Sequence, residues 1–179
     1  MSFKIRSDLN ISANHNFECV FVQVRKSSFA RKIIGSIYRP PNSDLDLFMW
    51  SLQSALDSSC HTKVECLLAG DFNLDLFKHD VHLGTEPFIN CLYQHSMIPL
   101  ITRPTWFTAD TITLIDNICS NKADTNWLSG ILIPEILDYI PVLFYISTIK
   151  IKTKFPKFVT INTKSIANEK LFMFKKWID

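Results

Sequence analysis

Alternation of apolar and polar residues predicts two strands in the first quarter of the chain. Phe17–Val24 alternates and is rich in Val and Phe, and Lys32–Tyr38 repeats the pattern until Pro40 and Pro41 stop it. β-Branched and aromatic residues with a period of two are typical of strands that bury one face. A polar turn around Lys26–Ser28 lies between the two runs, so we expect a hairpin.

Apolar residues at helical spacing predict two helices, one on either side of a buried strand. Leu45–Leu56 follows three candidate capping residues, Asn42–Asp44, and a second capped helix is expected to begin at Thr85–Pro87. Between the helices, Val64–Ala69 is a continuous apolar run that ends at Gly70. Such a run is typical of a strand that is buried on both faces.

Runs typical of strands dominate the second half of the chain. We expect strands over Ile112–Cys119, Leu128–Ile133 and Ile140–Ile151, and a last helix from the apolar residues between Ile166 and Trp177. Many strands with two or three helices between them fit a sheet sandwich covered by helices better than a strictly alternating parallel sheet. The expected fold class is therefore mixed α/β (α+β).

Length and composition indicate one domain that does not enter a membrane. The 179 residues suit one domain, and a hydrophobic fraction of 47% supplies a sizeable core. The apolar stretch Ile131–Ile149 contains Pro134, Glu135, Asp138 and Pro141, and such charges and helix breakers argue against a spanning helix. Five scattered cysteines without a C-x-x-C pair favour a reduced, intracellular protein.

Candidate chemistry begins directly after the buried strand, at Gly70-Asp71-Phe72-Asn73. In an extended chain Asp71 and Asn73 point to the same side, while Phe72 points into the core. Asp71 would orient and help to deprotonate a water, and Asn73 would donate hydrogen bonds to that water or to a phosphate oxygen. Gly70 would let a backbone or ligand approach closely. The alternative is a polar loop that merely follows a strand.

Three more polar side chains lie at the ends of apolar runs. Tyr38 ends the second strand, Asp116 lies within the apolar Leu114–Ile118, and Asp138 precedes the strongest strand signal. An isolated carboxylate inside an apolar strand is costly to bury without a partner. Each has an alternative reading as a turn or strand cap, yet their common position at strand ends favours one shared site.

Five motifs follow one another along the chain: Tyr38–Pro41, Gly70–Asn73, Ile101–Thr105, Leu114–Ile118 and Asp138–Val142. Their order resembles a known family, the endonuclease domains of Jockey- and CR1-like non-LTR retrotransposons, which belong to the endonuclease/exonuclease/phosphatase superfamily. The resemblance runs from about Phe17 to Ile149. On its basis we expect residues 1–152 to be the C-terminal part of such a domain, and residues 153–179 to resemble the linker that precedes a reverse transcriptase.

This resemblance implies an incomplete four-layer αββα sandwich and Mg²⁺-dependent cleavage of a DNA phosphodiester, with no small-molecule cofactor. By match to the family motifs, Tyr38 would contact the phosphate. Asp71 and Asn73 would position the attacking water and the phosphate. Asp116 would orient the general base, and Asp138 would lie next to the metal. A cation suits this chemistry because negative charge concentrates on the phosphoryl oxygens and the leaving group.

By the same match, Arg39, Arg103 and Thr105 would contact DNA. The formal net charge of +2 permits a nucleic-acid partner without demanding one. If the chain is functional, the resemblance places it in the nucleus. It does not indicate an oligomeric state.

The chain departs from the family at the catalytic histidine. Tyr139 stands there, and a phenol with a reference pKa of about 10 replaces imidazole poorly near pH 7. Loss of one such group typically costs about 10²–10⁴-fold in rate. The family's opening strands, with an Asn and the principal metal-binding Glu, have no match; Glu18 belongs to the following segment and is not assigned as that ligand. Trp106 stands where the family tends to have Arg.

We therefore expect a degenerate, inactive endonuclease fragment. Two alternatives stay open: a non-enzymatic nucleic-acid-binding relic and a phosphoesterase with a rearranged site. Structural zinc is disfavoured, because His79 and His82, with Cys60 and Cys66 nearby in the sequence, do not form a four-ligand set of the usual spacing.

Overall fold

A six-stranded sheet forms the centre of the molecule in the computed structural model, which describes residues 2–13, 16–25, 31–60, 64–122, 127–133, 141–146, 158–164 and 169–176. Its strand order is β1-β2-β3-β4-β8-β5. β3 and β4 run parallel, and the other neighbouring pairs are antiparallel. The strands are β1 (Ser2–Ile5), β2 (Glu18–Arg25), β3 (Arg31–Tyr38), β4 (Glu65–Asp71), β8 (Asp116–Ser120) and β5 (Ile98–Pro99). The expected β2–β3 hairpin pairing and the buried β4 are confirmed.

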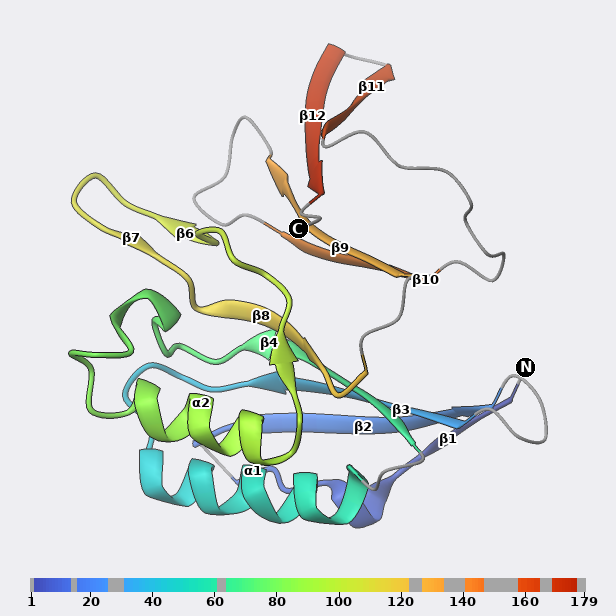
Figure 1. Ribbon diagram of the computed structural model, residues 1–179, viewed down its shortest axis with the longest axis vertical. Helices are drawn as coiled ribbons and strands as arrows, with labels where there is room; N and C mark the ends of the chain where they lie inside the picture. The colour runs from blue at the N-terminus through green and yellow to red at the C-terminus, as the bar shows by residue number, and fades with distance from the viewer. Residues whose placement is uncertain are drawn as a thin grey trace.

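Two helices, α1 (Leu45–Ser59) and α2 (Thr85–Gln94), cover one face of this sheet (Figure 1). α1 is the crossover between the parallel strands β3 and β4, as parallel pairing requires. Its cap is Asp44, whose carboxylate accepts a hydrogen bond from the Leu47 backbone N–H at 3.0 Å. The helix expected at Thr85 is confirmed, but its side-chain cap is not: the N-cap residue is Gly84, which has no side chain to accept a bond.

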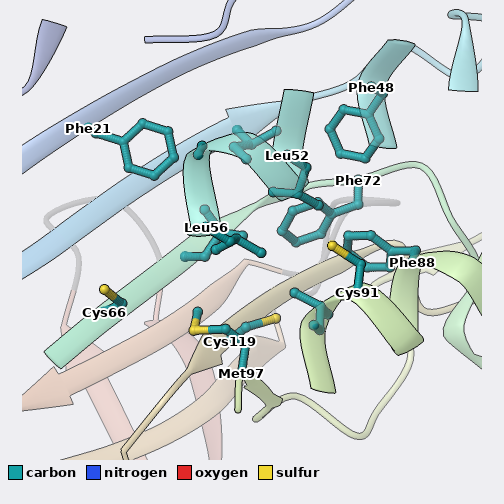
Figure 2. Packing of buried hydrophobic residues seen from close by; sticks show 14 of the residues in the cluster. Phe21, Phe48, Leu52, Leu56, Cys66, Phe72, Phe88, Cys91, Met97 and Cys119 are labelled. Carbon is teal, nitrogen blue, oxygen red and sulfur yellow. The ribbon is translucent and has the colours of Figure 1, made fainter. Parts of the chain in front are cut away.

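The main core lies between the helices and the sheet, and aromatic rings fill it (Figure 2). Phe48 comes from α1 and Phe88 from α2, and Phe72 comes from the loop that follows β4. The Phe72 and Phe88 ring centroids are 4.9 Å apart. Burial of Phe72 therefore anchors the first residue after β4, as its alternation with Asp71 predicts.

A second sheet lies on the side of the main sheet away from the helices (Figure 1). Its order is β10-β9-β12-β11. Ile131 of β9 packs with Leu67 of β4 and with Ile101, Leu114 and Ile118 in a second buried cluster. The described residues thus form a helical layer and two sheet layers, and the mixed α/β class is confirmed. Its strands are β9 (Trp127–Ile133), β10 (Val142–Ile146), β11 (Phe158–Lys164) and β12 (Glu169–Lys176).

Two expected elements differ from the structure. The helix expected near the end is wrong, because β12 occupies Glu169–Lys176 and pairs with both β9 and β11. The expected strand Ile112–Cys119 is interrupted: β7 (Ile112–Thr113) pairs with β6 (Trp106–Phe107), and β8 starts only at Asp116. Short apolar runs fit both the helical period of 3.6 residues and the strand period of two, and pairing with neighbouring strands decides which structure forms.

Two short 3-10 helices, η1 (Ser7–Leu9) and η2 (Leu76–Lys78), complete the described elements. None of the helices in the described ranges has the length and apolar character needed to cross a membrane.

Candidate functional site

Three predicted site residues form one row across the central strands. Tyr38 at the end of β3 pairs with Asp71 at the end of β4, and Asp71 pairs with Asp116 at the start of β8. Residues paired in this way point to the same face of a sheet. Ile37 and Cys119, which alternate with members of the row, belong to the buried helix-side core. The row therefore lies on the face away from the helices.

Asn73 reaches this row through a tight turn. β4 ends at Asp71, and Asn73 has a φ of 48°, in the left-handed region that Asn tolerates. The Asp71 carboxylate accepts a hydrogen bond from the Asn73 backbone N–H at 3.0 Å, and Asn73 Nδ2 donates to the Arg39 carbonyl at 2.8 Å. The expectation of an extended chain across Asp71–Asn73 is therefore wrong, while their proximity is achieved by an Asx-type turn.

Arg39 stabilises the Asp71–Asn73 turn through hydrogen bonds to its backbone. Its Nε donates to the Phe72 carbonyl at 2.8 Å, its Nη2 to the Asn73 carbonyl at 3.0 Å, and its Nη1 to Ser43 Oγ at 2.8 Å. Burial lowers the pKa of the guanidinium, and the Asp71 charge opposes that shift. Because Arg39 is only 3% exposed and its donors bind these groups, it is not available to a DNA phosphate here. It positions the loop instead.

Gly70 is required by the close approach of β3 and β4. A Cβ at this position would lie 1.9 Å from the Ile37 carbonyl oxygen, far inside any real contact. The sequence left open whether a backbone or a ligand approaches Gly70, and the structure shows that it is the backbone. This contact brings Tyr38 and Asp71 to the same level in the sheet.

Thr105 lies beside Asp116 and is fully buried. Its Oγ1 accepts hydrogen bonds from the backbone N–H groups of Ile115 at 3.3 Å and Asp116 at 3.1 Å. Its hydroxyl is therefore also unavailable to DNA in this structure. Arg103, two residues earlier, is exposed.

Two residues that sequence reasoning did not assign hold the segments around the row. Buried Asn117 accepts hydrogen bonds at its Oδ1 from the Leu100 and Ile101 backbone N–H groups, both at 3.1 Å. Asp75 Oδ1 accepts from the Leu114 backbone N–H at 3.0 Å. A polar side chain inside an apolar motif must find partners when it is buried, and that signal was present in the sequence for both.

Burial and like charge act together on the two carboxyls of the row. Burial raises the pKa of Asp71 to about 6 and the Asp116 charge adds to the shift, while hydrogen bonds from Asn73 and the Arg39 charge oppose it. Burial also raises the pKa of Asp116, against a side-chain hydrogen bond with Thr105. The Asp116 Oδ2 atom is buried and has no hydrogen-bond partner. Both carboxyls of the row therefore lie where burial disfavours their charged forms.

This donor set fits a cation only in part. No group of three or more His, Cys, Asp or Glu side chains placed to hold a metal ion occurs within the described ranges. Mg²⁺ often binds one or two carboxylates and completes its shell with water and substrate phosphate. Asp71 and Asp116, with one carboxylate oxygen unpartnered, fit that open arrangement and do not form a closed cage. Asp138, the predicted metal ligand, and Tyr139 lie outside the described residues.

Comparison with solved structures identifies the fold. The endonuclease domain of TRAS1, a telomere-specific non-LTR retrotransposon, matches with a TM-score of 0.59 at 13% identity over 81% of this chain and 66% of that domain. Endonuclease/exonuclease/phosphatase proteins from Beutenbergia cavernae and Leptotrichia buccalis match with TM-scores of 0.53 and 0.50 at 10% and 16% identity, over 80% and 72% of this chain.

These similarities concern the fold, because the identities are low. The chain spans 44% and 52% of the two bacterial proteins and 66% of the TRAS1 domain. No protein-family model matches the sequence, and no curated protein matches it either.

Proposed function

We propose that this chain, which has the endonuclease/exonuclease/phosphatase fold, derives from a Mg²⁺-dependent DNA endonuclease of a non-LTR retrotransposon and no longer cleaves DNA. The observation that carries the proposal is the row Tyr38–Asp71–Asp116, with the Asn73 backbone N–H bonded to Asp71 and the Asn73 carboxamide bonded to the adjacent Arg39 carbonyl. A phenol, a carboxamide and two carboxyls at adjoining strand ends are the groups that binding and hydrolysis of a phosphodiester require.

Each side chain of the row has a definable part in that chemistry. The Asp71 carboxyl, with a pKa of about 6, can accept a proton from a water close to neutral pH. The Tyr38 hydroxyl, on a half-exposed side chain, can donate to a phosphate oxygen. A Mg²⁺ ion held through the unpartnered Asp116 oxygen would neutralise charge on the phosphoryl oxygens and leave Asp71 free to accept the proton.

Loss of cleavage follows from what replaces the catalytic groups. Tyr139 occupies the histidine position of the resembled family, and its phenol is a poor proton acceptor near pH 7. The described residues supply two carboxylates to a cation that prefers six oxygen ligands. Two of the three residues expected to contact DNA, Arg39 and Thr105, are buried, and their side chains form hydrogen bonds with backbone groups of the protein. These defects act together, so repair of one leaves the others in place.

A nicking assay tests this proposal. Purified chain incubated with supercoiled plasmid and Mg²⁺ should give no more nicked product than the matched Asp71→Ala variant. Tyr139→His should also give no more, since it leaves the weak metal site unchanged. Rescue by Tyr139→His alone would overturn the proposal. Mg²⁺-dependent hydrolysis that is present in the parent chain and lost in Asp71→Ala would instead identify an active phosphoesterase.

A further inference from the structure

Two cysteines meet at the end of β4 that lies farthest from Asp71. Cys60 directly follows α1, and Cys66 is the second residue of β4. Both contact the same residue: Cys60 Sγ lies 3.8 Å from Ser59 Oγ, and Cys66 Sγ lies 3.2 Å from the Ser59 carbonyl oxygen. The Cys66 sulfur thus contacts the residue that directly precedes Cys60 in the chain. The pair is therefore held together by the junction between α1 and β4.

Access distinguishes Cys60 from the other thiols. Cys60 is half-buried, whereas Cys66, Cys91 and Cys119 are buried. Cys19 is the other half-buried cysteine, but its sulfur contacts Asn10 and Ser12 and no second thiol. Cys60 thus offers an entry point for a small oxidant, and the buried Cys66 thiol contacts the adjacent Ser59.

The environment also favours the thiolate at Cys60. Hydrogen bonds from Cys66 and Ser59, helped by the nearby His95, lower the pKa of the Cys60 thiol to about 7 despite its burial. The same contact and burial raise the pKa of the Cys66 thiol, and burial raises the pKa of Cys91 to about 11 and of Cys119 to about 12. Since the thiolate is the nucleophile, oxidation should start at Cys60.

We propose that Cys60 and Cys66 form a peroxide-sensitive thiol pair that closes reversibly to an intramolecular disulfide. The Cys60 thiolate attacks one oxygen of hydrogen peroxide, so that an S–O bond forms, the O–O bond breaks and hydroxide leaves; the hydroxide takes up the proton that Cys60 released to solvent on ionisation and becomes water. The Cys66 sulfur then attacks the sulfur of the Cys60 sulfenic acid, an S–S bond forms, the S–O bond breaks, and the departing hydroxyl takes the Cys66 thiol proton and leaves as a second water. Two thiols lose two electrons in total, and peroxide is reduced to water.

Oxidation of the folded protein, followed by mass-spectrometric mapping of its free and linked cysteines, tests this proposal. The reduced full chain is treated with a small excess of hydrogen peroxide, alkylated under denaturing conditions, digested and analysed by mass spectrometry. The free thiols should fall from five to three, because two of the five cysteines are consumed, and the linked peptides should contain Cys60 and Cys66. Dithiothreitol should restore all five. Recovery of both residues as alkylated thiols would overturn the proposal.

Two variants provide matched controls. Cys19→Ser removes the other half-buried thiol and should leave the disulfide yield unchanged, whereas Cys60→Ser should abolish it. In Cys66→Ala the Cys60 sulfenic acid has no resolving thiol, so dimedone should trap it. An equal loss of thiols in Cys60→Ser and in the parent chain would contradict the assignment. Mapping of the unmodified chain decides the question even where the buried Cys66→Ala change prevents folding.

Discussion

Asp71 and Asp116 lie opposite each other on β4 and β8, and each is half-buried. Folding brings two carboxyls together where burial disfavours the charge of both. The Asp71 carboxylate gains a hydrogen bond from Asn73, but its pKa is still raised to about 6. The fold therefore tolerates a charge at Asp71 at a cost in stability, as is common at functional sites.

The cost at Asp71 predicts a pH-dependent effect of Asp71→Asn. The folded pKa of about 6 lies above the reference value of 3.8, so the contribution of this carboxyl to stability is complete below about pH 3.8 and is lost as the pH rises through 6. The neutral, isosteric Asn should therefore stabilise the fold by about 1 kcal/mol more at pH 8 than at pH 4, a figure reduced for partial solvent exposure. Urea denaturation at both values measures it.

The exposed Asp110 provides the control for this experiment. Asp110→Asn removes one carboxylate from the turn between β6 and β7 and should show a smaller change between the two pH values. An equal response of the two variants would contradict the shift at Asp71.

At the scale of elements, the site depends on how closely β3 and β4 approach. Their parallel pairing places Tyr38 beside Asp71, and the β4–β8 ladder places Asp116 beside both. Arg39, which directly follows β3, donates hydrogen bonds to the Phe72 and Asn73 carbonyls and so links the segments that follow β3 and β4. The row is a product of strand register rather than of any one motif.

Gly70→Ala should disturb this register. The new Cβ would meet the Ile37 backbone oxygen at 1.9 Å, and a backbone atom inside a ladder cannot move aside as a side chain can. We expect a loss of about 1–3 kcal/mol in the free energy of unfolding, as is typical of overpacking, measured by thermal or urea denaturation.

Gly84→Ala is the matched control, because the nearest atom to its new Cβ is the tip of the Leu45 side chain at 2.5 Å. A flexible tip can shift, so the loss there should be smaller. A loss at Gly84 equal to or greater than that at Gly70 would count against the backbone clash.

At the scale of the whole molecule, the second sheet covers the main sheet unevenly. Leu67 on β4 is buried in the cluster that includes Ile131 of the second sheet. Ile34 on β3 and Ile5 on β1 lie on the same face at the same level of the main sheet, but both are exposed. Phe3 and Val20 extend this exposed apolar face. Contiguous apolar surface beside the edge strand β1 favours self-association.

Charge on this face should suppress that association. Phe3 is 76% exposed and Ile5 59% exposed, so Phe3→Lys combined with Ile5→Lys removes much apolar surface with little loss of packing. We expect lower ANS fluorescence and a later onset of aggregation in light scattering.

Trp50→Lys is the control, because Trp50 is also large and 72% exposed but lies on α1, on the opposite side of the sheet. An equal improvement by Trp50→Lys would show that general surface hydrophobicity, not this face, drives aggregation.

Local sequence alone determined the elements whose signals are complete within a few residues. The alternation of β2 and β3, the helical spacing of α1 and α2, and the inward direction of Phe72 all follow from periods of two and 3.6. The candidate residues Tyr38, Asp71 and Asp116 could also be predicted from the sequence, because a polar group at the end of an apolar run is a local anomaly.

Only the tertiary structure decided features that depend on distant partners. The run Glu169–Lys176 became a strand through pairing with β9, and Arg39 became a loop anchor because its guanidinium donates to the Phe72 and Asn73 carbonyls. Pairing, burial and contact are properties of two segments at once, so no single stretch of sequence contains them.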